Sequence, residues 1–263
     1  MAVDLAGLVA DLAAETADLD ALLGAVPATA WGTPTPADGW TIADQVSHLA
    51  FFDAAATLAA TDAARFRAER DELTALGEDY PDLVAARYRH LPGAGLLAWF
   101  RAAREEFLRT FGTIDPARRL PWYGPDMSPA SAVTARLMET WAHGLDIADA
   151  LAVTRRPTAR LRHVAHLGVR TMAFSFALRG LPEPDQPVRI ELEAPDGTTW
   201  TWGPPGVANR VTGPALDFCL VVTQRRHRAD TSLRPTGPVA RQWLAIAQAF
   251  AGAPGPGRPA ATL

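Results

Sequence analysis

Lysine is missing from this sequence, and all 25 of its basic residues are arginine. The absence excludes catalysis through a Schiff-base lysine and a phosphate-binding loop of the kind that needs a lysine. Cysteine is nearly missing as well. The single Cys219 rules out an internal disulfide and a cysteine zinc cluster, which makes a reducing cytoplasm the simplest compartment. Its neighbours Phe218, Leu220 and Val221 indicate a buried, inert thiol rather than a nucleophile.

Long apolar runs are also missing, and none approaches the ~18–20 residues that span a bilayer, so we expect no membrane segment. The N-terminal stretch MAVDLAGLVADLAAE has early acids and no basic residue, which argues against a secretory signal. The formal net charge of -4 argues against nucleic acid as the main partner, because a protein that neutralises phosphates needs a basic face. A chain of 263 residues with 48% hydrophobic residues is long enough for one large domain or two modest ones.

The first part of the chain has the pattern of helices. Leucines recur at helical spacing over residues 5–23, and Pro27 ends the run. A second helix is expected to begin at Thr41, which forms a capping-box-like pair with Asp44, and to continue to about residue 70.

Three more helices are expected over residues 95–111, 128–153 and 158–181. Ser128 is the expected N-cap of the middle one, with a proline at the first helical position. The pattern assigns no element to residues 71–92.

The composition changes after residue 181. Apolar and polar residues alternate over residues 188–193 and again over residues 199–202, and a Pro-Asp-Gly turn lies between them, which predicts a hairpin. Helical patterns return at residues 214–223 and 238–250. The sequence therefore predicts an α+β fold: a helical bundle over residues 1–180, a small α/β domain over 181–252 and a disordered tail over 253–263.

A candidate metal site follows from helical spacing. Glu139 and His143 are four residues apart, which places their backbones about 6 Å apart on one helix face. His48, on the second helix, could meet them across the interior. Two histidines and one carboxylate suit a catalytic zinc with an open fourth position, and they also suit non-haem iron. A Glu and a His at this spacing are more often solvated or hydrogen-bonded side chains than metal ligands, so the spacing alone does not establish a metal site.

Asp146 lies one turn beyond His143 on the same face. A metal-bound histidine usually donates its other N–H to a carboxylate or a carbonyl group. Asp146 is therefore the candidate for supporting His143 from behind, with a surface position as the alternative.

Two segments that hold these residues resemble a known family. GWTIADQVSHLAFFD (residues 39–53) and METWAHGLDIADAL (residues 138–151) are similar to the signature stretches of the mycothiol-dependent maleylpyruvate isomerase family, whose N-terminal domain is a DinB-like metal-binding four-helix bundle. VRIELEAPDGTTWTWG, VTGPALDFCLVVTQRR and LRPTGPVARQWLAIAQAF resemble its second domain, in the same order. The greatest resemblance is to an actinobacterial branch described only as metal-binding.

The resemblance implies a ligand set and a cofactor. His48, Glu139 and His143 would hold one divalent ion, with zinc favoured over nickel, iron and manganese. Waters or the thiol of mycothiol would complete the shell. Arg225 would be the catalytic arginine of the second domain, although the family's T-G-R stretch reads T-Q-R here because Gln224 replaces the glycine.

Three functions are compatible with these residues. The first is a metal-dependent enzyme that acts on a small molecule with a low-molecular-weight thiol, by isomerisation through thiolate addition and elimination or by S-transfer. The second is a thiol-independent enzyme that uses metal-bound water or Lewis-acid catalysis. The third is a non-catalytic metal-binding protein. Only three protein ligands leave a position open, which favours catalysis. The pattern specifies no substrate and no oligomeric state.

Overall fold

The computed structural model describes residues 4–77 and 79–261. Its contacts divide the chain into two compact units, Met1–Arg155 and Arg156–Leu263. The predicted α+β fold, a helical unit followed by one with a small sheet, is confirmed. The boundary expected near residue 180 falls inside the second unit. Among the described residues, no helix is long and apolar enough to cross a membrane.

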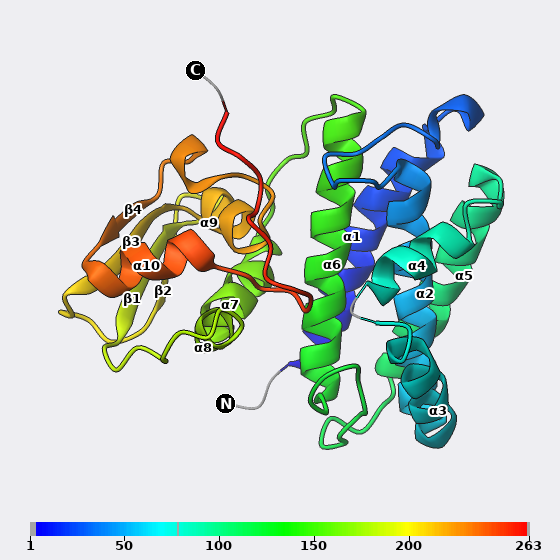
Figure 1. Ribbon diagram of the computed structural model, residues 1–263, viewed down its shortest axis with the longest axis horizontal. Coiled ribbons are helices and arrows are strands. Elements are labelled where there is room, and N and C mark those ends of the chain that lie inside the picture. Colours follow the sequence, from blue (N-terminus) through cyan, green and yellow to red (C-terminus); the bar gives the residue numbers. More distant parts are fainter. Residues whose placement is uncertain (1–3, 78, 262–263) are drawn as a thin grey trace. The chain divides into compact units, whose positions relative to one another are not determined.

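Four long helices form the bundle of the first unit (Figure 1). They are α1 (Leu5–Gly24), α2 (Ile42–Thr61), α5 (Gly93–Phe111) and α6 (Pro129–Ala150). α2 packs against α5 and α6, and α1 packs against α6 and α5. The expected capping at Ser128 is present, because its hydroxyl accepts a hydrogen bond from the backbone N–H of Ser131 at 3.1 Å.

Shorter helices connect the long ones. The 3-10 turn η1 (Ala28–Ala30) follows α1, while α3 (Ala63–Thr74) and α4 (Tyr80–Arg87) follow α2. The prediction of one helix to about residue 70 is wrong, because Asp62 leaves the helical conformation at φ -141°. The Asp62 carboxylate then caps the next helix by accepting from the backbone N–H of Arg65 at 3.0 Å.

Apolar side chains from the four long helices form a core cluster. Fully burying a leucine or phenylalanine stabilises the fold by about 1.5–3 kcal/mol each, so this core fixes how α2 and α6 face one another. Its buried members come from α1, α2, α5, α6 and the loop before α2: Leu19, Leu23, Trp31, Ile42, Val46, Leu49, Ala50, Leu96, Phe100, Ala103 and Ile147.

The second unit begins with two short helices, α7 (Leu161–Arg170) and α8 (Met172–Ala177). One helix was expected over residues 158–181, but the chain departs from regular helix at Thr171, which separates the two. α7 packs on α9 (Ala215–Val222) and α8 packs on α10 (Pro238–Ile246), both of which belong to the second unit.

A four-stranded sheet follows, in the order β2-β1-β3-β4. The predicted hairpin is confirmed: β1 (Val188–Glu193) pairs antiparallel with β2 (Thr199–Trp202). β1 also pairs in parallel with β3 (Asn209–Pro214), which pairs antiparallel with β4 (Arg234–Thr236). Neither β3 nor β4 was expected, because their pairing joins segments far apart in the sequence.

Two helices cover the sheet, α9 (Ala215–Val222) and α10 (Pro238–Ile246), with the 3-10 turn η2 (Arg228–Asp230) between them. The described part of the expected disordered tail, residues 253–261, forms no helix or strand. It makes hydrogen bonds at Gly255 and Ala261. Residues 262 and 263 of that prediction lie outside the described residues.

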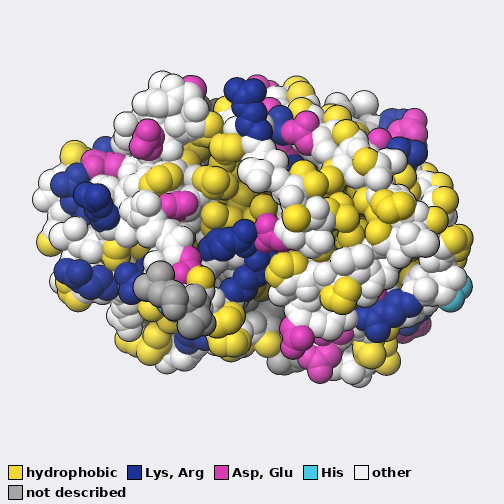
Figure 2. Space-filling view, turned by 90° about the horizontal axis from the view of Figure 1, so that it is seen from above, with side chains coloured by type: hydrophobic (Ala, Val, Ile, Leu, Met, Phe, Trp, Pro, Cys, Tyr) yellow, Lys and Arg dark blue, Asp and Glu magenta, His cyan; other side chains and the backbone are white. Residues whose placement is uncertain are grey.

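Charged side chains of both signs are interspersed with hydrophobic ones over the face seen in Figure 2. The described atoms of that face therefore present no continuous field of one charge.

Candidate metal centre

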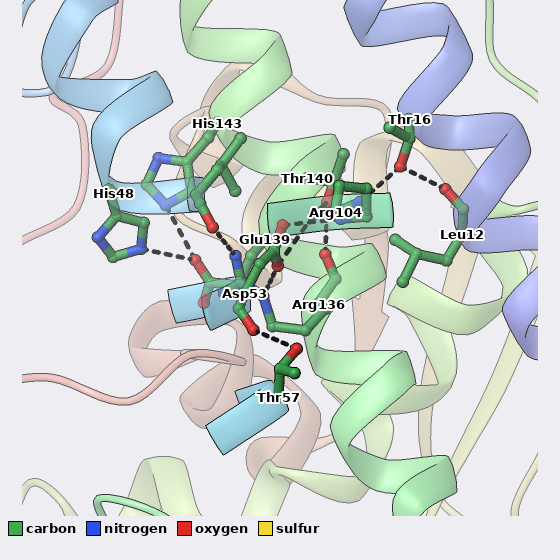
Figure 3. Close-up of polar contacts among 11 residues, drawn as sticks. Leu12, Thr16, His48, Asp53, Thr57, Arg104, Arg136, Glu139, Thr140 and His143 are labelled. Carbon is green, nitrogen blue, oxygen red and sulfur yellow. Dashed lines mark hydrogen bonds and ion pairs between the residues drawn. The ribbon is translucent and has the colours of Figure 1, made fainter. Parts of the chain in front are cut away.

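The three expected ligands meet inside the bundle (Figure 3). One oxygen of Glu139, Oε2, lies 2.9 Å from Nε2 of His143 and 3.5 Å from Nε2 of His48. The two imidazole rings have their centroids 4.5 Å apart. Among the described residues, this is the group of three metal-binding side chains whose ligand atoms all lie within 4.8 Å of one another. Helical spacing brought Glu139 and His143 together, and the packing of α2 on α6 adds His48.

The N-terminus of α2 is held firmly, which fixes the height of His48 in the bundle. The expected capping box is present: Oδ2 of Asp44 accepts from the backbone N–H of Thr41 at 2.8 Å, and the Thr41 hydroxyl accepts from the N–H of Asp44 at 3.4 Å. Arg89, just beyond α4, donates from Nε to Oδ1 of Asp44 at 2.8 Å. His48 follows one turn later on a helix whose start is fixed from two sides.

The other ring nitrogen of His143, Nδ1, hydrogen-bonds with Oε1 of Gln45. Gln45 is fully buried and lies one turn before His48 on α2. Asp146 is also fully buried on α6. The support that Asp146 is expected to give His143 stays a prediction.

Aromatic rings surround the two histidines. Trp40, in the loop before α2, lies nearly parallel to His143 at a centroid distance of 5.8 Å, and 5.3 Å from His48. Its indole Nε1 donates to Asp82 of α4 at 2.5 Å. The ring of Phe52 lies 4.6 Å from that of His48. The two histidine side chains are only 12% and 10% exposed, and electrostatic interactions in such surroundings are stronger than in water.

The protonation states suit a cation. Burial lowers the pKa of His48 to about 4, and the charge of His143 acts in the same direction, so His48 is neutral at pH 7. Burial alone would raise the pKa of Glu139, but hydrogen bonds from His143 and His48 outweigh it and hold that pKa well below its ordinary 4.5. The site therefore offers an ionised carboxylate and a neutral imidazole at neutral pH.

These residues fit a divalent ion. Zinc binds imidazole nitrogen and carboxylate oxygen at about 2.0–2.2 Å, which places neighbouring ligands of a tetrahedral ion roughly 3.3 Å apart. The separations from Glu139 to the two histidines, 2.9 and 3.5 Å, lie on either side of that value. Side-chain exposures of 12% for His48 and 21% for Glu139 show that the group is accessible from solvent.

Below the histidines lies a buried ionic network that sequence reasoning missed (Figure 3). Asp53 of α2 accepts from Nε of Arg104 of α5 and from Nε of Arg136 of α6, both at 2.8 Å. Arg136 also donates to the backbone carbonyl of Leu49, and Arg104 donates to the hydroxyl of Thr140. The network ties α2 to the helix that carries Glu139 and His143. Its signal in the sequence was Arg104, a charge on the apolar face of a helix.

Arg225, the expected catalytic arginine, belongs to the second unit. It follows α9, donates from Nη1 to the carbonyl of Thr223 at 2.8 Å and lies 6.0 Å from the ring of Phe250. Gln224 before it has φ +58°, a left-handed conformation that favours glycine. The glycine expected at this position from the resemblance therefore has a conformational reason.

Comparisons with known proteins cover nearly the whole chain. Residues 12–148 match the family described as mycothiol maleylpyruvate isomerase N-terminal domain, and residues 184–233 match one described as wyosine base formation. Two uncharacterized proteins of Mycobacterium tuberculosis, from strains CDC 1551 and H37Rv, are each 49% identical over 250 residues, which are 95% of this chain and 97% of theirs.

Solved structures share the fold. A crystal structure of mycothiol-dependent maleylpyruvate isomerase superimposes with a TM-score of 0.61 and 14% identity, over 89% of this chain and 93% of that one. A mutant of that enzyme gives a TM-score of 0.62 and 14% identity, over 90% of this chain and 97% of that one. At this identity the likeness speaks for the fold alone.

Proposed function

The chain belongs to the mycothiol maleylpyruvate isomerase family, and from that premise we propose that it is a divalent-metal-dependent enzyme that uses a low-molecular-weight thiol, mycothiol, on a small molecule. The observation that supports the proposal most directly is the convergence of Nε2 of His48, Nε2 of His143 and Oε2 of Glu139 inside the bundle. Zinc is the proposed ion, since two imidazoles and one carboxylate suit it.

The protein itself lacks a nucleophile of the required kind. It has no lysine, and Cys219 is fully buried, with its thiol directed to the carbonyl of Leu161 at 3.4 Å. Burial raises the pKa of that thiol far above its ordinary value, so it is protonated at neutral pH. An added thiol supplies what the chain does not, and a reducing cytoplasm is where such a thiol persists.

A divalent metal bound at this site supplies Lewis-acid chemistry that favours the thiolate over a thiol of ordinary pKa ~8.5. His48, His143 and Glu139 would hold the ion. Trp40 and Phe52 pack against the two histidines. Arg225 is the proposed contact for an anionic group of the substrate, since a guanidinium pairs well with a carboxylate. Isomerisation and S-transfer are the proposed reactions, because both need a thiolate.

Cobalt substitution tests this proposal. With cobalt in place of the native metal, mycothiol should produce a sulfur-to-metal charge-transfer band. Glu139→Ala should abolish the band. His90→Ala is the matched control, because His90 is exposed and its Nδ1 contacts only the local carbonyl of Arg87. Arg225→Ala should keep the band and slow the reaction of an anionic substrate.

Two outcomes would redirect the proposal. If mycothiol leaves the cobalt spectrum unchanged while the protein turns over a substrate, a thiol-independent metalloenzyme takes its place. If His143→Ala and wild type retain equal metal against a chelator, the ligand assignment fails, and a protein with metal but no turnover is a binding protein.

A further inference from the structure

We propose that Gln45 is a positioning residue that keeps a hydrogen on Nδ1 of His143, so that Nε2 is the nitrogen that faces the metal. The metal part of this proposal rests on the proposed function. In the metal-free chain Nε2 of His143 is hydrogen-bonded to the carboxylate of Glu139, and the hydrogen on Nδ1 is separate from that bond and depends on the chain alone. It follows from counting donors and acceptors along four groups: His143, Gln45, Thr35 and the backbone of Trp40.

The count begins at the loop before α2. The carbonyl of Trp40 accepts from the backbone N–H of Thr35 at 2.7 Å and from its hydroxyl at 2.9 Å. A threonine hydroxyl has one hydrogen to donate, and that hydrogen is directed to Trp40. Toward any other partner the Thr35 oxygen can only accept.

The partner of that oxygen is the side-chain amide of Gln45. Its Nε2 lies 2.8 Å from Oγ1 of Thr35, within hydrogen-bond distance. Because the Thr35 oxygen can only accept, the amide must present its NH₂ group there. The carbonyl oxygen of the same amide is then directed to His143, where the hydrogen bond to Nδ1 is found.

A carbonyl oxygen cannot donate, so Nδ1 of His143 must carry the hydrogen of that bond. Rotating the amide of Gln45 by half a turn would place its carbonyl against a hydroxyl whose hydrogen is already directed to Trp40. It would also place the NH₂ group against Nδ1. Gln45 is fully buried, so water does not offer a substitute for the lost bond. The orientation found is the one that leaves the hydrogen bond from the Thr35 hydroxyl to Trp40 in place.

The two histidines differ in this respect. Nδ1 of His48 is buried and has no hydrogen-bond partner among the described residues. His143 alone has a ring nitrogen held by a buried side chain from the facing helix. An amide of α2 thus holds Nδ1 of His143 and links the orientation of this ring to the loop that carries Trp40.

Zinc affinity shows what the loss of the Gln45 hydrogen bond does to His143. Losing the partner of a ligand histidine typically costs ~10–100-fold in affinity, and we expect that loss of zinc affinity for Gln45→Met in competition with a chelator. Thr35→Val, which keeps the shape and removes the hydroxyl, should weaken binding in the same direction. Thr35→Ser should restore it. The threonine pair alters a half-buried loop position and keeps the test decisive if Gln45→Met fails to fold.

Nitrogen NMR of histidine-labelled, metal-free protein tests the hydrogen directly, with the His143 signals assigned by their loss in His143→Ala. Wild type and Thr35→Ser should show a hydrogen on Nδ1 of His143. A neutral ring with hydrogen on Nε2 alone in wild type overturns the proposal, and so does equal zinc affinity of wild type, Gln45→Met and Thr35→Val. If wild type binds no metal, the proposed function fails, while the NMR result still decides the role of Gln45.

Discussion

Asp53 meets Arg104 with both carboxylate oxygens: Nε of the arginine lies 2.8 Å from Oδ2, and Nη2 lies 3.2 Å from Oδ1. Both side chains are shielded from solvent. Arg136 donates to the same carboxylate from α6, so one carboxylate pairs with two buried guanidinium groups on different helices. The network ties α2, which carries His48, to α6, which carries Glu139 and His143.

Asp53→Asn should therefore destabilise the protein strongly. Removing one partner of a buried ion pair leaves an uncompensated charge and typically costs about 3–5 kcal/mol. Urea denaturation at neutral pH measures the loss. Glu69→Gln is the matched control, because Glu69 pairs with Arg65 at 2.7 Å on the exposed surface of α3, and such i,i+4 pairs contribute about 0.3–0.5 kcal/mol. Equal losses in the two variants would show that the buried network does not stabilise the bundle.

The capping carboxylate Asp44 gives a prediction for pH. Burial would raise its pKa, but hydrogen bonds from Arg89 and Thr41 lower it below the ordinary 3.8. A depressed pKa means that the ionised form stabilises the folded state above pH 3.8, and that this stabilisation is lost as the pH falls through the folded-state pKa. Asp44→Asn should be less stable than wild type at pH 7.

The difference in unfolding free energy between these two proteins should shrink as the pH is lowered below 3.8. Chemical denaturation at several pH values checks this. A gap that stays constant down to the lowest pH at which both proteins fold would mean that the charge of Asp44 does not contribute.

Much of this organisation could be predicted from local patterns. Helical spacing located α1, α5 and α6, the capping pair at Thr41 located the start of α2, and alternation located the β1–β2 hairpin. Features that depend on distant partners were missed. β4 is only three residues long, and β3 is defined by parallel pairing with β1, which no local pattern encodes.

The candidate site divides in the same way. The residues that resemble a known family, including His48 and Glu139, were found from the sequence. Gln45 was not, although it lies one turn before His48, because its role depends on Thr35 and on His143 of another helix. Arg104 lies between Phe100 and Phe107 on an apolar helix face. A charged residue in that place indicates a buried partner of opposite charge, but the sequence does not show that this partner is Asp53.

The environment of Cys219 predicts slow reaction with thiol reagents. Its thiol is fully buried in α9, and burial raises its pKa, so little thiolate is available at neutral pH. A chromogenic disulfide reagent should titrate no thiol in the native protein and one thiol per chain after denaturation. Cys219→Ala should retain the cobalt charge-transfer signal with mycothiol. Rapid labelling of the native protein would show that the chain carries an accessible thiol of its own.

The last prediction concerns where the bundle ends. All the residues of the candidate metal centre lie before residue 155. Arg155 itself is part of the bundle: it pairs with the buried Glu15 of α1 and donates to the carbonyl of Trp141. We expect a fragment of residues 1–155 to fold with a helical circular-dichroism signal and to bind zinc as the full chain does.

The boundary expected from the sequence, residue 180, provides the comparison. A fragment of residues 1–180 adds α7 and α8, whose packing partners are α9 and α10 of the second unit. Without those partners, buried side chains such as Leu161, Val164 and Phe176 become exposed to water. Exposed apolar surface of this kind promotes association. Light scattering should therefore show more aggregation for the longer fragment than for the shorter one. A monomeric 1–180 fragment beside an unfolded 1–155 fragment would place the boundary of the folding unit at the later position.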